Sequence, residues 1–140
     1  MIVVDTNVLV YAVGADHPLT APARRLLDAV ASGEITASTT VEVIGEFAHV
    51  RARRRGRADA AALARSFATL LGPLITTTAT DLDSGLGLWA EHESLGAFDS
   101  VLIAASERVG ARAIITADRA MMQASSVPVI ALTDVDRLFT

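Results

Sequence analysis

Residues 2–12 of this 140-residue chain read IVVDTNVLVYA. The first three, Ile2–Val4, form a β-branched apolar run of the kind found in short buried strands. Apolar positions then recur with helical spacing from Val8 to Ala12. The stretch predicts a strand that passes directly into a helix, with the polar residues Asp5, Thr6 and Asn7 at the junction.

Strands and helices are expected to alternate along the rest of the chain. Short apolar runs predict further strands at Ile35–Ser38, Leu74–Thr78, Ala113–Thr116 and Val129–Leu132. Helical patterns lie between them, among them Ala58–Leu71, Asp81–Glu93 and Phe98–Val109. This alternation is typical of a mostly parallel sheet covered on both faces. Because no linker or repeat interrupts it, we expect a single α/β domain over residues 1–140.

The composition provides a core and excludes several classes of enzyme. Hydrophobic residues make up 51% of the chain, which is enough to bury a core. All twelve positive charges are arginines, so the lysine of a Walker-A loop, of a Schiff-base enzyme or of a phospho-acceptor receiver domain is missing. The absence of cysteine excludes disulfides, thiolate zinc sites and thiol nucleophiles. No signal peptide is recognisable, and no apolar run approaches the roughly 20 residues that cross a bilayer, so we expect a cytoplasmic protein without membrane contact.

Three aspartates fall where open parallel sheets place their ligand sites, beyond the carboxyl ends of the strands. Asp5 ends the first strand, Asp118 comes two residues after the fourth, and Asp99 opens a helix after a glycine-containing connection. Each has a structural alternative, because aspartate is among the best helix N-caps. Clustered carboxylates repel one another unless a cation neutralises them. Since the available ligands are oxygens, the sequence predicts a site for Mg²⁺ or Mn²⁺.

A fourth carboxylate is expected from the helix that begins near Thr40. Glu42 and Glu46 share one face of this helix with His49 and Arg53. Glu46 lies one turn deeper among apolar neighbours, so we expect it in the site and keep Glu42 as the alternative. The structural alternative is a solvated face on which Arg53, His49 and Glu46 pair.

Two hydroxyl side chains end strands beside the expected site. Ser38 follows the second strand's apolar run and Thr116 closes the fourth. Both are candidates for hydrogen bonds to a ligand or a bound water, and both are equally suited to turns.

One dense basic patch stands on an acidic chain whose net charge is −4. Residues 51–57 read RARRRGR, with arginine at five of the seven positions, whereas acidic residues are spread throughout. A negative net charge argues against a nucleic-acid partner. If four acids are set aside as metal ligands, however, the twelve that remain balance the twelve arginines.

With these motifs the chain resembles the PIN-domain ribonucleases, and most closely the VapC-type toxins of bacterial toxin–antitoxin pairs. The resemblance spans residues 2–122 and rests on IVVDTNVLVYA, VIGEFAHV, LGAFDSVLIAAS and IITADRAM. One departure is that Met121 or Met122 stands where an aromatic residue usually closes the last motif. The resemblance implies a three-layer fold with a five-stranded parallel sheet in the order 3-2-1-4-5.

The resemblance also implies the site and its activity. It maps the metal-binding acids onto Asp5, Glu46, Asp99 and Asp118. Thr6 and Asn7 are supporting groups, and Thr116 or Ser38 would hydrogen-bond to the ligands without contacting the metal. It implies a Mg²⁺-dependent endoribonuclease toxin that a cognate VapB-type antitoxin neutralises and that forms a homodimer. We expect hydrolysis to leave a 5′-phosphate and a 3′-hydroxyl, because the metal-held carboxylates need no 2′-hydroxyl.

The arginine patch has two functional interpretations and one structural one. Its members are candidates for phosphate contacts to RNA or for an antitoxin-binding surface, and the alternative is a solvated helix end. They are Arg51, Arg53, Arg54, Arg55 and Arg57. A phosphatase or receiver domain is disfavoured by the missing lysine and by DTN in place of DxD. The remaining alternative to the nuclease is a metal-free PIN-like RNA-binding or scaffold protein.

Overall fold

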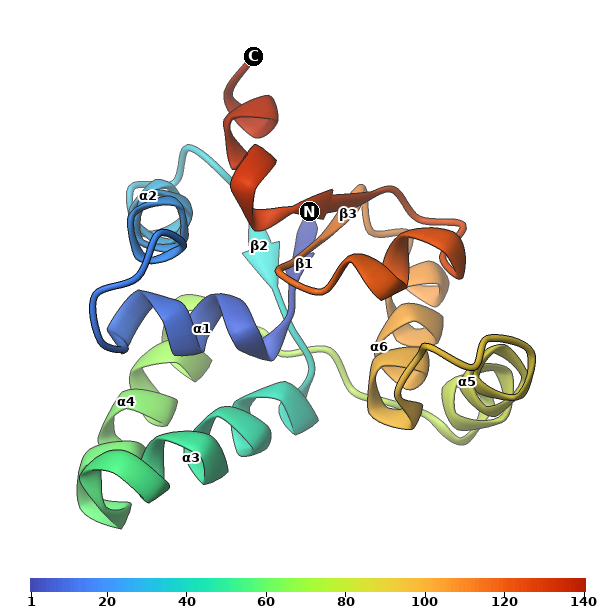
Figure 1. Cartoon of the computed structure of the whole chain (residues 1–140), viewed down its shortest axis with the longest axis horizontal. Helices are drawn as coiled ribbons and strands as arrows, with labels where there is room; N and C mark the ends of the chain where they lie inside the picture. The colour runs from blue at the N-terminus through green and yellow to red at the C-terminus, as the bar shows by residue number, and fades with distance from the viewer.

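The computed structural model describes residues 1–140. Figure 1 shows its strands at the centre with helices on both sides. In chain order the elements are β1 (Ile2–Val4), α1 (Thr6–Val13), α2 (Thr20–Ala31), β2 (Ala37–Ser38), α3 (Val41–Arg55), α4 (Arg57–Leu70), α5 (Ala79–Glu91), α6 (Ala97–Arg108), β3 (Ala113–Thr116), the 3-10 helix η1 (Arg119–Gln123), β4 (Val129–Ala131) and the 3-10 helix η2 (Leu132–Phe139).

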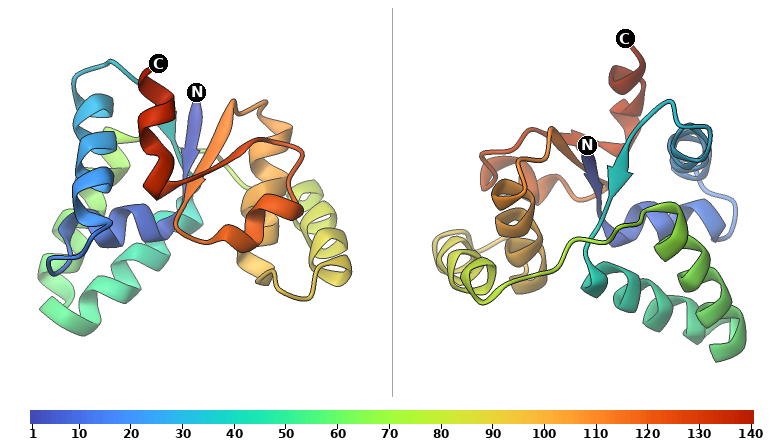
Figure 2. Two further views of the ribbon diagram at one scale, coloured as in Figure 1. Left: turned by 45° about the horizontal axis from the view of Figure 1, so that its top comes forward. Right: turned by 180° about the vertical axis from the view of Figure 1, so that it is seen from behind.

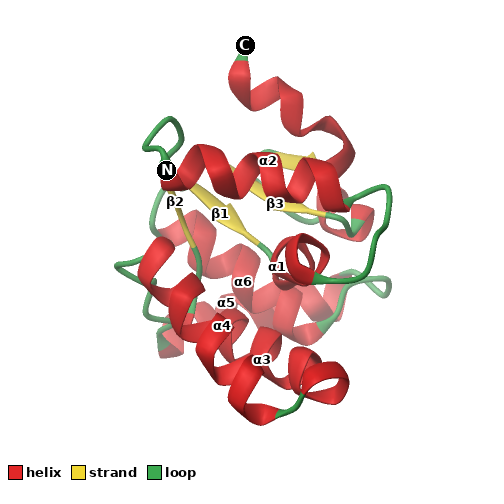
Figure 3. Ribbon diagram, turned by 90° about the vertical axis from the view of Figure 1, so that its left-hand side faces the viewer, coloured by secondary structure: helices red, strands yellow, loops and turns green.

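The sheet has four parallel strands in the order β2-β1-β3-β4. The first strand of the chain is central, with Val3 opposite Ser38 on one side and Ile114 on the other. Helices α1 to α4 lie on one side of the sheet, and α5 and α6 lie on the other (Figures 1 and 2). Figure 3 shows the same strands seen past α2. The predicted α/β class with a parallel sheet between helices is confirmed.

The prediction of a fifth strand at Leu74–Thr78 is wrong. This segment makes one isolated parallel bridge, between Ile75 and Thr40, on the far side of β2. The adjoining strand β2 is only two residues long, so it offers little edge to pair with. The next residues bond elsewhere: the carbonyl of Thr76 accepts from Arg108, and Thr78 caps α5.

Local capping sets where the helices begin. The Asp5 side chain accepts from the backbone N–H of Thr6 and starts α1 at the end of β1. Thr40 caps α3 in the same way after β2. Gly56, with φ of 84°, separates α3 from α4 in a backbone conformation that residues with a side chain rarely adopt. The caps of α1 and α3 therefore place two helix N-termini at the carboxyl ends of neighbouring strands.

One hydrophobic cluster of 31 buried residues fills the space between the layers. Phe47 and Phe67 join α3 to α4 edge to face, with ring centroids 5.0 Å apart. Helices α5 and α6 approach closely at Gly85, where a Cβ would lie 2.8 Å from the Cα of Val101. None of the helices combines the length and the apolar character that a bilayer span requires.

Candidate active site

Asp5 is the most deeply buried acid at the carboxyl edge of the sheet. Its side chain is 5% exposed and lies between β1 and α1. One oxygen accepts from the N–H of Thr6 at 2.7 Å, and the other accepts from the hydroxyl of Thr116 at 2.8 Å. Burial raises the pKa of Asp5 more than these hydrogen bonds lower it, and the charges of Glu46 and Asp118 raise it further.

Asn7 and Thr116 tie the ends of β1 and β3 together. The amide nitrogen of Asn7 donates to Asp5 and to the hydroxyl of Thr116, both at 3.2 Å, and its oxygen accepts from the N–H of Ala117 at 3.0 Å. The N–H of Asp118 donates to Thr116 Oγ1 at 2.9 Å. The DTN and TAD motifs, more than a hundred positions apart, therefore form one hydrogen-bonded unit.

Glu46 reaches this unit from α3. The hydroxyl of Thr6 donates to Glu46 Oε2 at 2.9 Å, which links the first turn of α1 to the middle of α3. Glu42, one turn earlier, has no such contact with the unit, and it lines the neighbouring cleft. Glu46 lines the hollow that also holds Asp118, whereas Glu42 shares only the cleft with Asp5.

Asp99 enters from the other side of the sheet, in the first turn of α6. Gly96 leaves room for it, because a Cβ at this position would lie 3.3 Å from the Asp99 carboxylate. Burial, and then repulsion by the other carboxylates, raises the pKa of Asp99 from its ordinary 3.8 to about 7. No hydrogen bond or cation offsets these effects.

Asp118 completes the group from the loop after β3. Its carboxylate accepts from the N–H of Ala120 at 2.9 Å and so caps η1. Asp5, Glu46, Asp99 and Asp118, which we call the carboxylate cluster, line one hollow of about 390 Å³. None of the three ion pairs in the structure involves the cluster.

The chemistry of these donors fits a hard divalent cation. The four side chains offer only oxygen ligands. Burial first, and then the neighbouring carboxylates, raise the pKa values of Asp5 and Asp99, and a bound cation would offset both effects. No three acidic or histidine side chains already stand in metal-binding geometry.

The five arginines of residues 51–57 divide into different environments. Arg51 is 13% exposed and bound within the fold, because it donates to Asp59 at 2.7 Å and to the carbonyl of Val13 at 2.8 Å. Arg53 contacts His49 on the exposed face of α3, which is one part of the structural alternative, but Glu46 accepts from Thr6 and takes no part in that pairing. Arg54 is the one arginine that lines the hollow of the carboxylate cluster. Arg55 and Arg57 are exposed on either side of Gly56.

The other sequence candidates lie outside the cluster. Ser38 is buried and donates to the carbonyl of Pro73 at 3.0 Å, so it fixes the segment that follows α4. Tyr11, assigned from sequence only to an apolar helix face, lines the hollow beside Arg54. Helical spacing gave no signal of this position, because the hollow forms only when α1 packs on α3.

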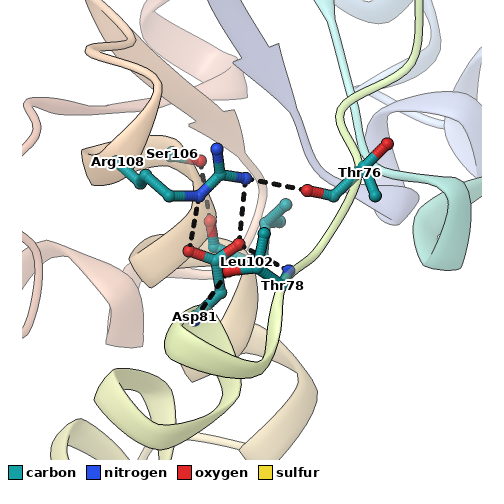
Figure 4. A network of polar contacts seen from close by, with 6 residues as sticks. All are labelled: Thr76, Thr78, Asp81, Leu102, Ser106 and Arg108. Carbon is teal, nitrogen blue, oxygen red and sulfur yellow. Dashed lines mark hydrogen bonds and ion pairs between the residues drawn. The ribbon is translucent and has the colours of Figure 1, made fainter.

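A second buried acid, Asp81, was also missed and has the opposite environment (Figure 4). Arg108 donates to its two oxygens at 2.8 Å and 3.0 Å, and also to the carbonyl of Thr76 at 2.7 Å. Thr78 and Asp81 form a capping box at the start of α5. These hydrogen bonds, led by the one from Arg108, hold the pKa of Asp81 below its ordinary value.

Comparison with known proteins gives consistent matches along most of the chain. The PIN domain family matches residues 2–126. Ribonuclease VapC7 of Mycobacterium tuberculosis is 48% identical over 131 residues, which cover 91% of this chain and 88% of that protein. Ribonuclease VapC23 of the same species is 35% identical over 126 residues, which cover 89% and 98% respectively.

Solved structures of low sequence identity share the fold. FitAcB from Neisseria gonorrhoeae superposes with a TM-score of 0.75 at 15% identity, covering 95% of this chain and 99% of that one. VapBC2 from Rickettsia felis, bound to a DNA fragment from its promoter, gives 0.72 at 18% identity, with coverages of 94% and 98%. The toxin VapC20 of M. tuberculosis, which cleaves the sarcin-ricin loop, gives 0.68 at 20% identity, with coverages of 81% and 87%.

Proposed function

Because this chain belongs to the PIN-domain family, and within it to the VapC ribonucleases, we propose that the carboxylate cluster is its active site. The protein is an RNA-cleaving hydrolase and the toxin of a toxin–antitoxin pair. The observation that carries the assignment of residues is the convergence of four carboxylates, from β1, α3, α6 and the loop after β3, without a paired cation.

Mg²⁺ or Mn²⁺ is the ion that we propose for this cluster. When bound, such an ion would acidify a water and stabilise negative charge on the scissile phosphate. Asp5 is fixed by Thr6 and Thr116, and Glu46 is oriented by Thr6, so these two carboxylates are positioned before the ion arrives. Burial and the neighbouring carboxylates raise the pKa of Asp99 to about 7, so binding of a cation there would favour its carboxylate form. The expected products are a 5′-phosphate and a 3′-hydroxyl.

The arginines beyond Arg51 are proposed to bind the RNA backbone. Arg54 lies in the hollow of the cluster, and Arg53, Arg55 and Arg57 are exposed around the end of α3. Arg51 is left out because its side chain is bound to Asp59 and Val13. The family further supports a VapB-type antitoxin as partner and a homodimer as the assembly. We place the activity in the cytoplasm, where such an RNA substrate would be.

Cleavage of total RNA tests the assignment. Wild-type protein should cleave in Mg²⁺ or Mn²⁺, stop in EDTA, and leave 5′-phosphate ends. Asp5→Asn should lower the rate on the order of a thousandfold, since the metal contributes several kcal/mol to the barrier. Asp83→Asn, at an exposed acid on α5, is the matched control and should cleave normally. Metal-independent cleavage, or full activity of a folded Asp5→Asn protein, would exclude the cluster as the active site.

A further inference from the structure

A second hollow adjoins the carboxylate cluster on the side of α5 and α6. It is a cleft of about 740 Å³, and Asp5, Glu46 and Asp99 line both it and the hollow that contains Arg54. Phe98 and Leu82 belong to the cleft alone. The shared acids therefore stand between a polar hollow and a partly apolar cleft.

We propose that this cleft binds one unstacked nucleobase of the RNA, next to the bond that is cut, with Phe98 as the stacking surface. The inference rests on the proposed function, because it takes the carboxylate cluster as the place of cleavage. It adds a base-binding subsite on one side of that place. Single-stranded RNA is commonly bound in this way, by stacking of splayed bases on aromatic side chains.

Charge favours a base over the sugar-phosphate backbone in the cleft. No arginine lines it, and His49 is its one basic side chain, whereas Glu42 adds a further carboxylate to the three shared ones. When the three shared acids hold an ion, Glu42 is the carboxylate left free in the cleft. It disfavours an anionic phosphate there but can accept from the N–H groups of a neutral base. Arg54 lines the other hollow and not the cleft, so a phosphate would find a positive charge there. The strand would thus cross the cluster with a base on one side and a backbone contact on the other.

The position of Phe98 couples the stacking surface to the chemistry. It directly precedes Asp99 in the first turn of α6, so a base stacked on it would hold a fixed place relative to that carboxylate. Its side chain is 82% exposed, the highest value among the large hydrophobic residues. Phe47 and Phe67, in contrast, pack against each other in the interior. Because Phe98 contributes so little to the core, its replacement should leave the fold intact.

Cleavage of a defined oligonucleotide tests the subsite. Digestion of total RNA first locates a cleavage site. Three single-stranded RNAs that span this site are then made: one intact, one with an abasic nucleotide on the 5′ side of the cut, and one with it on the 3′ side. For the wild type, one of the two abasic substrates should lose about tenfold to a hundredfold in kcat/KM. Phe98→Ala should lower kcat/KM on the intact RNA by the same factor. On that abasic RNA the variant and the wild type should have the same kcat/KM, since both changes remove the same contact.

Two further variants separate stacking from structural effects. Phe98→Trp should restore kcat/KM on the intact RNA, because it restores an aromatic face. Trp89→Ala removes another exposed aromatic, which is 48% exposed on α5 and lies outside the cleft, and it should change nothing. Thermal unfolding of each variant checks that the fold is retained.

Several outcomes would overturn the inference and leave the nuclease in place. The first is equal cleavage of both abasic RNAs, and the second is an unchanged kcat/KM for Phe98→Ala. The third is that the losses in kcat/KM from Phe98→Ala and from the abasic nucleotide add when the two changes are combined. An unchanged kcat/KM together with a changed sedimentation coefficient would assign the cleft to a second copy of the chain. If the wild type cuts no RNA in either metal, the proposed function itself fails, and the subsite fails with it.

Discussion

The two ends of helix α6 lie beside acidic side chains in opposite electrostatic environments. At the C-terminal end, Arg108 binds both oxygens of Asp81, and the pKa of this buried acid is lowered. At the N-terminal end, Asp99 faces three other carboxylates without a paired cation, and its pKa is raised to about 7. A buried acid that has its cation within the fold acts as a structural link, here between α5, α6 and the segment before α5.

We expect the cluster at the other end to lower the stability of the metal-free protein, because its carboxylates are buried without a paired cation. An arrangement of this kind is expected where the missing positive charge comes from outside the chain. Helix α6 therefore has an acid paired with an arginine of the chain at one end and acids that lack a paired cation at the other. Five experiments address this difference, taken from the largest expected effect to the smallest.

Loss of Arg108 is expected to reduce stability most. Arg108→Met keeps an aliphatic stem but leaves Asp81, which is 2% exposed, without its cation. The melting temperature should fall by more than in any variant below, while cleavage per folded molecule is retained. Arg112→Met, at an exposed arginine outside the ion pairs, is the control. Equal melting temperatures for the two variants would show that the ion pair does not stabilise the fold.

Gly85→Ala tests whether packing also holds α5 to α6. The added Cβ would lie 2.8 Å from the backbone of Val101, so the helices must move apart. We expect a loss of about 1–3 kcal/mol in the free energy of unfolding, measured in urea. Gly87→Ala in the same helix has open space and should be neutral or slightly stabilising. A neutral Gly85→Ala would mean that the ion pair alone sets the helix spacing.

Asp99→Asn should make the metal-free protein more stable while abolishing cleavage. The substitution removes a carboxylate whose pKa is raised to about 7. After allowance for the part of the group that water reaches, we expect a gain on the order of 1–2 kcal/mol at pH 8. Chemical unfolding in EDTA measures this gain. A loss of stability would contradict the unfavourable charge balance that we assign to the cluster.

The pH dependence of stability should show both environments. Folded Asp99 keeps its proton up to about pH 7 but releases it near 3.8 when unfolded, so the metal-free protein should lose stability as pH rises from 4 to 7. Asp81 acts in the opposite sense: its lowered pKa stabilises the fold above its ordinary value of 3.8, and that stability is lost as pH falls further. Melting temperatures from pH 3 to 8, with and without Mg²⁺, test this. Mg²⁺ should flatten the fall between pH 5 and 7, and an unchanged slope would argue against ion binding at Asp99.

Arg54→Ala and Arg51→Ala test the two environments of the arginine patch, and Arg54→Ala, which should change RNA binding alone, has the smallest expected effect. Arg54→Ala should weaken RNA binding and lower the salt slope of log affinity by about one, with the melting temperature unchanged. Arg51→Ala should instead cost about 1–3 kcal/mol of stability, because Asp59 and the carbonyl of Val13 lose their donor. Fluorescence anisotropy across a salt series measures the first effect. An unchanged slope would move Arg54 from the RNA to the antitoxin surface.

Much of the local structure followed from neighbouring residues. The β1-to-α1 junction at Asp5 and the start of α3 near Thr40 were both expected, because helix caps depend on short sequence stretches. The strand predicted at Leu74–Thr78 failed for a non-local reason. Its pairing depended on the length of β2 and on Arg108, which binds the carbonyl of Thr76.

The sequence by itself determined the alternation of strands and helices and the acidic residues at the strand and helix ends. Only the tertiary structure decided which of these acids meet. Periodicity placed Glu42 and Glu46 on one face of α3, and the apolar neighbours of Glu46 favoured it. In the fold Glu46 accepts from the hydroxyl of Thr6, whereas Glu42 lines only the cleft. Likewise, packing of α1 against α3 made Arg51 structural and left Arg54 beside the cluster. Helix spacing and capping are fixed by residues a few positions apart, whereas a site is fixed by side chains that packing brings together from distant parts of the chain.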